Sequence, residues 1–207
     1  MALLFSDRFK DAPWLKEGIL PRVLIVGLGG IGSHTGFILS KTVPFTHLYL
    51  VDHDVVDQYN VGTQFYFVPQ IGKRKTTALY SMLSQIQPNA LIYTISERIE
   101  DTSPNWLNFD IIIIAVDSIK VRKYIINAIK EDLDKYVDFD PSVLPLVIDG
   151  RLNATSYEVF TISGVSPDES ISNRKYFEYQ LDAYKSSLID EESLGEGSCT
   201  MKQTYFF

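Results

Sequence analysis

The stretch RVLIVGLGGIG, residues 22–32, decides the fold class. Its first five residues form a continuous apolar run, which is typical of a strand buried on both faces of a parallel sheet. Gly27, Gly29 and Gly32 follow in the pattern G-x-G-x-x-G. Glycines in this pattern permit a tight turn, a close approach of backbone to phosphate, and close packing of helix on sheet. The stretch therefore predicts a strand, a phosphate-binding turn and a helix whose N-terminus attracts anions.

The rest of the chain continues this alternation of strands and helices. Buried-strand patterns occupy residues 47–51, 91–95, 109–116 and 144–148, and helical patterns occupy residues 75–87 and 119–132. This alternation predicts an α/β fold with a Rossmann-like, doubly wound, mostly parallel sheet and helices on both faces. An outer strand at 157–163 and a polar, loop-rich segment with a short helix near 174–184 follow.

We divide the chain into two parts on this pattern. Residues 1–155 are predicted to form a nucleotide-binding domain that begins with an N-terminal arm. Residues 156–207 are predicted to complete the sheet and to carry a loop around Cys199.

Composition excludes several classes of protein. The 207 residues include 26 acidic and 19 basic side chains, a net charge of −7, which disfavours nucleic acid as a partner. The longest apolar run, residues 111–116, is too short to cross a membrane, and no signal peptide is visible. Cys199 is the only cysteine, so neither an internal disulfide nor a cysteine-based zinc cluster can form within one chain. We therefore expect a cytoplasmic protein without a membrane partner.

Asp52 stands at the end of the second predicted strand, about 20 residues after the glycine motif. A carboxylate at this position accepts hydrogen bonds from ribose hydroxyls. Together with the glycine motif it predicts a nucleotide ligand. The motif alone fits a nicotinamide- or flavin-dependent enzyme as well as an ATP-dependent one.

The stretch VDHDVVDQYNVGTQFYFVPQIGKRK, residues 51–75, separates these ligands. Together with the glycine motif it resembles the ThiF/MoeB/HesA superfamily, which includes the ubiquitin-activating enzymes. The family pattern is G-x-G-G-x-G, then D-x-D-x-V, N-x-x-R-Q, G-x-x-K, and an Asp followed by an Arg at the end of a later strand. The matching residues are Gly27–Gly32, Asp52–Val56, Asn60–Gln64, Gly72–Lys75 and Asp117–Arg122.

The resemblance implies an adenylation domain that uses ATP and Mg²⁺. Lys75 would neutralise charge near the phosphates, and Asp117 would hold the metal, directly or through water. The remaining residues implied to bind the nucleotide are Gly27, Gly29, Gly30, Asp52, Asp54, Asn60 and Gln64. Two plainer interpretations stay open: Asp117 as an ordinary helix cap, and Lys75 as part of a solvated basic patch.

One position departs from the family pattern. Thr63 replaces the family arginine that contacts the phosphates. Arg74 is a local candidate to replace it. Arg8 is a second candidate, because the resemblance implies a homodimer in which an N-terminal arginine reaches the neighbouring active site. A plain surface arginine is the alternative interpretation of Arg8.

The resemblance also suggests a nucleophile. In ubiquitin-activating enzymes the thioester-forming cysteine begins a Cys-Thr-apolar step after a polar segment, and Cys199-Thr-Met201 resembles it. If Cys199 is the nucleophile, it takes the acyl group from the adenylate and passes it to a conjugating enzyme or another thiol acceptor. A buried, inert cysteine is the alternative. Arg151, in a predicted turn after a strand, is a candidate to bind the incoming carboxylate, with a simple exposed arginine as the alternative.

We expect ATP-dependent adenylation of the C-terminal carboxylate of a ubiquitin-like or sulfur-carrier protein. Three alternatives remain: a NAD-dependent oxidoreductase, a non-catalytic family member that serves as a partner scaffold, and an adenylating enzyme that acts on a peptide or an RNA-borne carboxylate. Residues 60–75 argue against the oxidoreductase, and Thr63 keeps the scaffold open.

Overall fold

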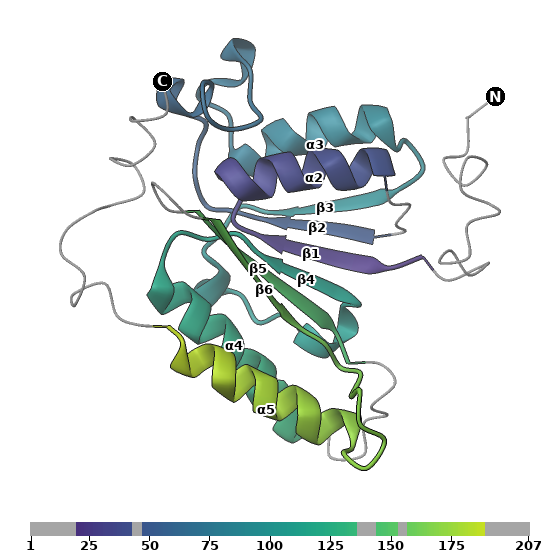
Figure 1. Ribbon diagram of the computed structural model, residues 1–207. Helices are drawn as coiled ribbons and strands as arrows, with labels where there is room; N and C mark the ends of the chain where they lie inside the picture. Colours follow the sequence, from purple (N-terminus) through teal and green to yellow (C-terminus); the bar gives the residue numbers. More distant parts are fainter. Residues whose placement is uncertain (1–19, 43–46, 136–143, 153–156, 189–207) are drawn as a thin grey trace.

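A single six-stranded sheet in the order β3-β2-β1-β4-β5-β6 organises the computed structural model, which describes residues 20–42, 47–135, 144–152 and 157–188 (Figure 1). The first five strands pair in parallel, and β6 pairs with β5 in the antiparallel sense. The strands are β1 Arg22–Val26, β2 His47–Val51, β3 Leu91–Ile95, β4 Ile111–Ile114, β5 Leu146–Leu152 and β6 Tyr157–Ile162. This topology confirms the predicted doubly wound α/β fold.

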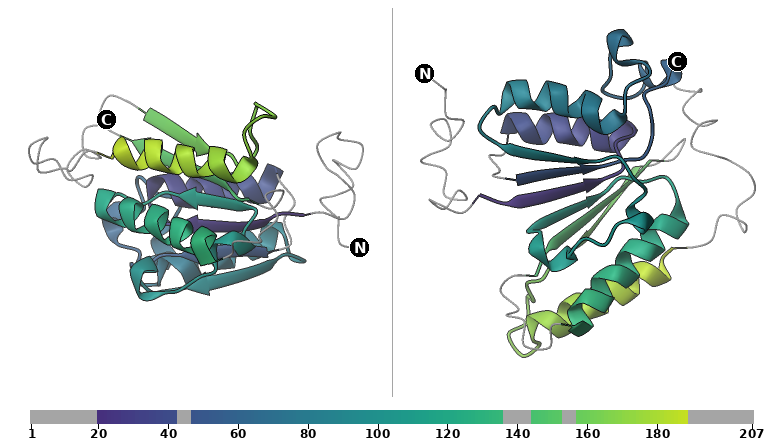
Figure 2. Two further views of the ribbon diagram at one scale, coloured as in Figure 1. Left: turned by 90° about the horizontal axis from the view of Figure 1, so that it is seen from below. Right: turned by 180° about the vertical axis from the view of Figure 1, so that it is seen from behind.

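Helices cover both faces of the sheet, as Figure 2 shows from two further directions. One face carries α2 (Gly30–Thr42) and α3 (Lys75–Ile86), and the other carries α4 (Ile119–Lys135) and α5 (Asn173–Ser186). Single 3-10 turns lie at Gln58–Asn60, Val68–Gln70, Ile99–Asp101 and Trp106–Asn108. Among the described residues, no helix is both long and apolar enough to cross a membrane.

The central strands are apolar throughout because both of their faces are covered. Along β1, Val23 and Ile25 belong to the core beneath α2 and α3, whereas Leu24 and Val26 belong to the core on the opposite face. All four side chains are at most 2% exposed. Burying an aliphatic side chain of this size contributes about 1.5–3 kcal/mol, so the β1 sequence stabilises a central strand far better than an edge strand.

The strand order reverses beside β1, and we call the region outside the carboxyl ends of β1 and β4 the crevice. The chain runs from β1 outward to β2 and β3, and then crosses back to β4 on the other side of β1. The loops that follow β1 and β4 therefore separate toward opposite faces. In open α/β sheets, ligands bind at this reversal, outside the carboxyl ends of the strands. The glycine motif follows β1, so the fold places it at the edge of the crevice.

The prediction for residues 149–151 was wrong about their local structure. The sequence indicated a strand over 144–148 with Asp149, Gly150 and Arg151 in the turn after it. In the structure β5 continues to Leu152, and all three residues lie inside the strand. The reason is antiparallel pairing with β6, in which Asp149 lies opposite Phe160. The predicted short helix near 174–184 is α5, which begins after Ser172, whose side chain accepts a hydrogen bond from the Lys175 N–H.

Candidate functional site

Steric contacts force glycine at two positions of the loop that follows β1. Gly27 has a φ of +88°, and a Cβ there would lie 2.7 Å from the Ala115 carbonyl oxygen. A Cβ on Gly32 would lie 1.8 Å from the Gly27 carbonyl oxygen. These contacts press the loop against both the end of β4 and the first turn of α2. Gly29 differs, because the nearest atom to its hypothetical Cβ is Gln64 Nε2 at 3.9 Å. Packing among the described residues therefore does not require glycine at position 29.

Asp52 holds this loop in place. Its Oδ2 accepts a hydrogen bond from the Leu28 N–H at 2.7 Å, and its Oδ1 accepts one from the Asp54 N–H at 2.7 Å. The residue is 8% exposed. A carboxylate oxygen can accept more than one hydrogen bond, so these contacts leave acceptor capacity for a ribose hydroxyl. Its predicted ribose contact remains a prediction, and the structure adds a positioning role.

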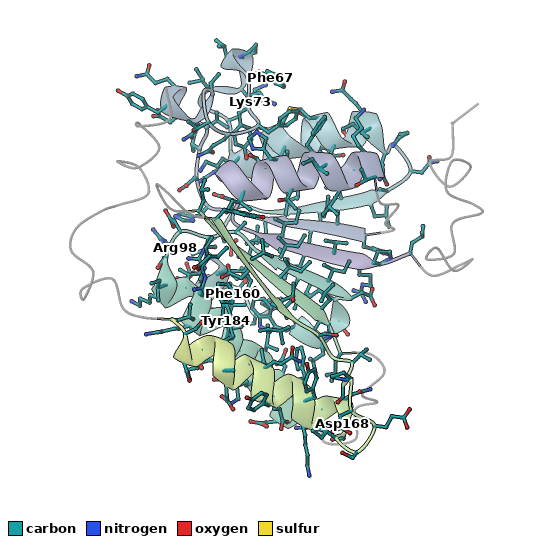
Figure 3. All side chains as sticks on the ribbon, in the orientation of Figure 1. Phe67, Lys73, Arg98, Phe160, Asp168 and Tyr184 are labelled. Carbon is teal, nitrogen blue, oxygen red and sulfur yellow. The ribbon has the colours of Figure 1, made fainter. Side chains whose placement is uncertain are left out.

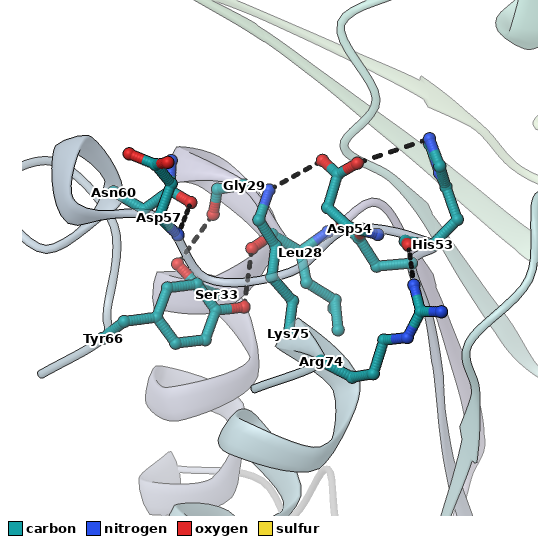
Figure 4. Close-up of polar contacts among 11 residues, drawn as sticks. Leu28, Gly29, Ser33, His53, Asp54, Asp57, Asn60, Tyr66, Arg74 and Lys75 are labelled. Carbon is teal, nitrogen blue, oxygen red and sulfur yellow. Dashed lines mark hydrogen bonds and ion pairs between the residues drawn. The ribbon is translucent and has the colours of Figure 1, made fainter. Parts of the chain in front are cut away.

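Residues 53–74, which we call the excursion, leave the sheet after β2 and are tied back to the glycine loop (Figure 4). The Tyr66 hydroxyl donates to the Leu28 carbonyl at 2.8 Å. Ser33 Oγ donates to the Gly29 carbonyl at 2.7 Å and accepts from the Phe65 N–H at 2.9 Å. Burial raises the Tyr66 pKa, and the negative charges of Asp52 and Asp54 raise it further, so the hydroxyl stays protonated and donates.

Sequence reasoning missed Tyr66 and Ser33 as parts of the site. Tyr66 stands between Phe65 and Phe67, so no local pattern singled it out. Ser33 stands directly after the last glycine of the motif, where a small polar residue is unremarkable. Both roles depend on the path of the excursion, which no local pattern specifies.

Backbone pairing within the excursion places Lys75 beside Asp54. Val55 and Arg74 form an isolated antiparallel bridge, and the Lys75 N–H donates to the Asp54 carbonyl at 3.0 Å. The pairing begins α3 with Lys75, whose Nζ lies 2.9 Å from Asp54 Oδ2 while its side chain is only 7% exposed. A solvated basic patch would leave this side chain in water, so its burial favours the functional interpretation of Lys75.

The Asp54 carboxylate is held ionised by its neighbours. Partial burial on its own raises the Asp54 pKa. The hydrogen bond and charge of Lys75 act in the opposite direction, with smaller effects from His53 and Arg98, and the net pKa lies below the ordinary value of 3.8. Lys75 and Asp54 therefore form a charged pair beside the glycine loop at neutral pH.

The predicted amides occupy different positions in the excursion. Asn60 Oδ1 accepts a hydrogen bond from the Asp57 N–H at 2.8 Å and so closes the 3-10 turn Gln58–Asn60. The Gln64 amide lies over Gly29, and its Oε1 is buried without a hydrogen-bond partner among the described residues. A buried acceptor without a partner is costly, and a ligand hydroxyl or amino group would satisfy it.

Arg122 connects the end of β4 to β5. Its Nη1 donates to the Asp117 carbonyl at 3.3 Å, and its Nε lies 3.0 Å from Asp149 Oδ1. Asp149 Oδ2 accepts from Arg151 Nε and from the Tyr184 hydroxyl, each at 2.7 Å. Burial raises the Tyr184 pKa, and the Asp149 charge raises it further, so this hydroxyl stays a donor. We call these four residues, Arg122, Asp149, Arg151 and Tyr184, the arginine cluster.

Asp117 is a candidate to hold Mg²⁺. Its side chain is exposed and makes no hydrogen bond or ion pair with the described residues, so its oxygens are available. Asp52, His53 and Asp54 also lie close enough together to hold a cation. Both Asp52 oxygens already accept backbone N–H groups, however, and Asp54 is paired with Lys75. Mg²⁺ typically takes one or two carboxylates from the protein and its other ligands from phosphate and water. The Asp117 side chain would supply one such carboxylate.

The other predicted residues are placed as follows. Thr63 Oγ1 donates to the Tyr59 carbonyl at 3.4 Å, and Arg74 Nη1 donates to the His53 carbonyl at 2.6 Å. Gly30 is the first residue of α2, where backbone N–H groups have no helical partner. Arg8 and Cys199 lie outside the described residues, so their roles remain predictions.

Comparison with known proteins identifies relatives of this chain. The family model described as "ThiF family" matches residues 20–166. The NEDD8-activating enzyme E1 catalytic subunit of Arabidopsis thaliana is 28% identical over 171 residues, which cover 79% of this chain and 37% of that protein. The ubiquitin-like modifier-activating enzyme 5 of Dictyostelium discoideum is 42% identical over 67 residues, which cover 32% of this chain and 17% of that protein.

Solved structures share the fold at lower identity. The E. coli tRNA N6-threonylcarbamoyladenosine dehydratase TcdA, in complex with ATP, has a TM-score of 0.53 and 18% identity. The match covers 81% of this chain and 65% of that chain. This likeness supports the doubly wound fold. The chain spans only 37% of the Arabidopsis thaliana relative and 25% of the matching Schizosaccharomyces pombe protein.

Proposed function

The chain belongs to the ThiF family, and on that premise we propose that it adenylates a carboxylate with ATP. The substrate class is the C-terminal carboxylate of a ubiquitin-like or sulfur-carrier protein. Relatives named as NEDD8-activating and ubiquitin-like-modifier-activating enzymes support this class. A relative named as the adenylyltransferase and sulfurtransferase UBA4, 30% identical over 143 residues, supports the sulfur-carrier variant.

The observation that carries the proposal is the buried Lys75 ammonium beside the glycine loop. Its side chain is 7% exposed, and its partner Asp54 comes from the loop directly after β2. A glycine turn at a helix N-terminus attracts phosphate, and a buried ammonium adds a full positive charge. The buried Gln64 Oε1 without a partner supplies a further group that a nucleotide would satisfy. This combination supports ATP over a nicotinamide dinucleotide.

The proposed first step is nucleophilic substitution at phosphorus. A carboxylate oxygen attacks the α-phosphorus of ATP, the bond from that phosphorus to the bridging oxygen breaks, and pyrophosphate leaves with the electron pair. The product is an acyl-adenylate. Lys75 would stabilise the negative charge that develops on the phosphate oxygens. Bound at Asp117, Mg²⁺ would supply additional charge neutralisation to the phosphates.

A second step is proposed at Cys199. The thiolate attacks the acyl carbonyl carbon, the carbonyl-to-phosphate bond breaks, and AMP leaves with a thioester as the product. Mass spectrometry of Cys199 after incubation with ATP and a carrier tests this step. A carrier adduct that hydroxylamine releases supports it. Adenylate formation without an adduct would mean that the reaction ends at the acyl-adenylate.

Pyrophosphate exchange tests the main proposal. The full chain is incubated with ATP, Mg²⁺, labelled pyrophosphate and a candidate carrier, and each carrier is paired with its C-terminally amidated form. We expect label to enter ATP only with the free carboxylate. If a carrier that binds in calorimetry gives no exchange in either form, the chain does not adenylate it.

The non-catalytic scaffold remains a second candidate because of Thr63. A threonine cannot supply the guanidinium of the family arginine, and the Thr63 hydroxyl donates to the Tyr59 carbonyl. Exchange by the wild-type protein would exclude the scaffold. Carrier binding without exchange in both the wild type and Thr63→Arg would favour it.

A further inference from the structure

Among the residues that the structure describes, the arginine cluster carries one more positive charge than negative charge in a largely buried setting. Two guanidinium groups, of Arg122 and Arg151, share the single Asp149 carboxylate. The side chains are 7% exposed for Arg122, 2% for Asp149 and 21% for Arg151. Buried charges in proteins are normally paired, so a cluster with one cation in excess is suited to an anion. This surplus is independent of the Lys75–Asp54 pair, which is balanced.

Arg151 is the member of the cluster with unused hydrogen-bonding capacity. Its Nε is committed to Asp149, but its Nη2 is buried and has no partner among the described residues. The guanidinium carbon lies 4.0 Å from the ring centroid of Phe160 and 5.0 Å from that of Tyr184. Figure 3 labels these two rings between the sheet and α5. The rings fix the plane of the guanidinium, so its free end is held in one orientation.

The cluster also lies at the crevice. Arg122 belongs to the start of α4 and donates to the Asp117 carbonyl. Gly150 contacts the first turn of α2, because its hypothetical Cβ would be 3.2 Å from Ile31 Cγ2. Residues 149–151 therefore bridge the two helix N-termini that border the crevice. Lys75 lies at the start of α3 and Arg151 lies in β5, so the two cations come from different elements.

We propose that Arg151 binds the substrate carboxylate that is to be activated. The Nη1–Nη2 end of a guanidinium matches the two oxygens of a carboxylate, whereas an ammonium offers a single point of charge. Asp149 and the two rings position Arg151, and Arg122 holds Asp149. The proposal rests on the proposed function, since it names Arg151 as the residue that binds the carboxylate substrate of the same adenylation site.

The test uses a small carboxylate in the absence of nucleotide, so its outcome does not depend on ATP binding. N-acetylglycylglycine is titrated into the ¹⁵N-arginine-labelled full chain, and N-acetylglycylglycinamide serves as the uncharged probe. The Nε–H resonance of Arg151 is assigned by its disappearance in Arg151→Lys. We expect a saturable shift of that resonance with the carboxylate and none with the amide. Equal shifts with both probes, or no shift, would overturn the proposal.

Two variants separate binding from structural support. Arg151→Gln is expected to weaken binding of N-acetylglycylglycine roughly tenfold or more, because a charge-assisted pair is lost. Tyr184→Phe removes another donor to Asp149 but keeps the guanidinium, so we expect less than about a threefold loss. Equal losses in the two variants would show a structural role only and overturn the proposal.

Failure of this proposal is distinguishable from failure of the proposed function. Suppose that N-acetylglycylglycine shifts the Arg151 Nε–H resonance in a protein that does not bind ATP. This result would support Arg151 as the residue that binds the carboxylate and would contradict adenylation. ATP binding without a carboxylate shift would contradict the role of Arg151 and leave adenylation standing.

Discussion

Single side chains at this site have a structural role beside the ligand role that we propose for them. Asp52 is the clearest case, since its two oxygens secure the glycine loop and the start of the excursion, and we propose that it also binds the ribose. Lys75 is similar, because its ammonium balances Asp54, and we propose that it also contacts the phosphates. Substitutions at these residues therefore require controls that separate stability from binding.

Replacing Lys75 should weaken ATP binding more than replacing a neighbouring lysine. We expect Lys75→Met to raise the Kd for ATP roughly tenfold or more, because a charge-assisted contact to phosphate is lost. Lys73→Met removes the same charge from an exposed side chain two positions away and should change the Kd less than about threefold. Calorimetry with both variants measures this difference. Equal effects would mean that Lys75 acts only through the general positive charge of the segment.

Asp52→Asn should destabilise the folded protein. The amide nitrogen would replace one carboxylate oxygen and face a backbone N–H, which leaves that donor without a partner. We expect a loss of about 1–3 kcal/mol in the free energy of unfolding, measured by urea denaturation. Asp57→Asn is the matched control, because Asp57 is exposed and its side chain caps only the short 3-10 turn Gln58–Asn60, where it accepts from the Tyr59 N–H. Its loss should be smaller than that of Asp52→Asn, and the reverse order would contradict the loop-holding role.

The Asp54–Lys75 pair should make stability depend on acid pH. The folded pKa of Asp54 lies below its ordinary value of 3.8, so the ionised form is favoured by folding. The resulting stability is fully present above the unfolded pKa and disappears as the pH falls through the folded value. Because Asp54 is half exposed, we expect less than about 1 kcal/mol.

The measurement for Asp54 compares the wild type with Asp54→Asn in urea between about pH 2 and pH 7. The difference in the free energy of unfolding should be constant above about pH 5 and should shrink below the unfolded pKa. A difference that grows on acidification would mean that the folded pKa is raised.

At the scale of elements, the β1–α2 connection is tightly constrained by backbone contacts. A Cβ on Gly32 would lie 1.8 Å from the Gly27 carbonyl oxygen. The backbones of Gly27 and Gly32 are held in place by β1 and α2. No rotation of a flexible side chain can relieve this contact. The helix would have to move away from the sheet, and the glycine loop would open with it.

Gly32→Ala should therefore cost at least about 3 kcal/mol in the free energy of unfolding, at the upper end of overpacking effects. Gly62→Ala is the control, since nothing lies within 4 Å of its hypothetical Cβ, and it should stay within about 0.5 kcal/mol of the wild type. Thermal and urea unfolding measure both variants. A Gly32→Ala protein as stable as Gly62→Ala would contradict the packing described for this turn.

The excursion and β5 show where local patterns stop determining structure. Strands β1 and β4 could be predicted because a strand that is buried on both faces needs a continuous apolar run, and such a run is visible in the sequence. The continuation of β5 through Asp149–Leu152 could not, because it depends on pairing with β6, whose sequence gives no register. The tether of Tyr66 to Leu28 likewise joins residues 38 positions apart.

At the scale of the whole molecule, two helix pairs cover the two faces of one sheet. The candidate site lies at the edge formed by the carboxyl ends of the parallel strands. The predicted Gly27, Gly29, Asp52, Asp54, Gln64 and Lys75 all gather at this edge. The spacing of the glycine motif and Asp52 predicted that these residues belong to one nucleotide site, since ligands bind outside the carboxyl ends of such strands. Asp54, Gln64 and Lys75 were implied by the family resemblance instead. The charge surplus at Arg151 could not be predicted, because it depends on which of several acids pairs with which arginine. Arg8 and Cys199 remain predictions from sequence.

Every part of the proposed function depends on the crevice taking ATP. Isothermal titration of the full chain with ATP and Mg²⁺, and separately with NADH, tests this most directly. We predict saturable binding of ATP, roughly tenfold or more weaker binding in Lys75→Met, and no heat of binding from NADH. Saturable binding of NADH with no binding of ATP would contradict the account.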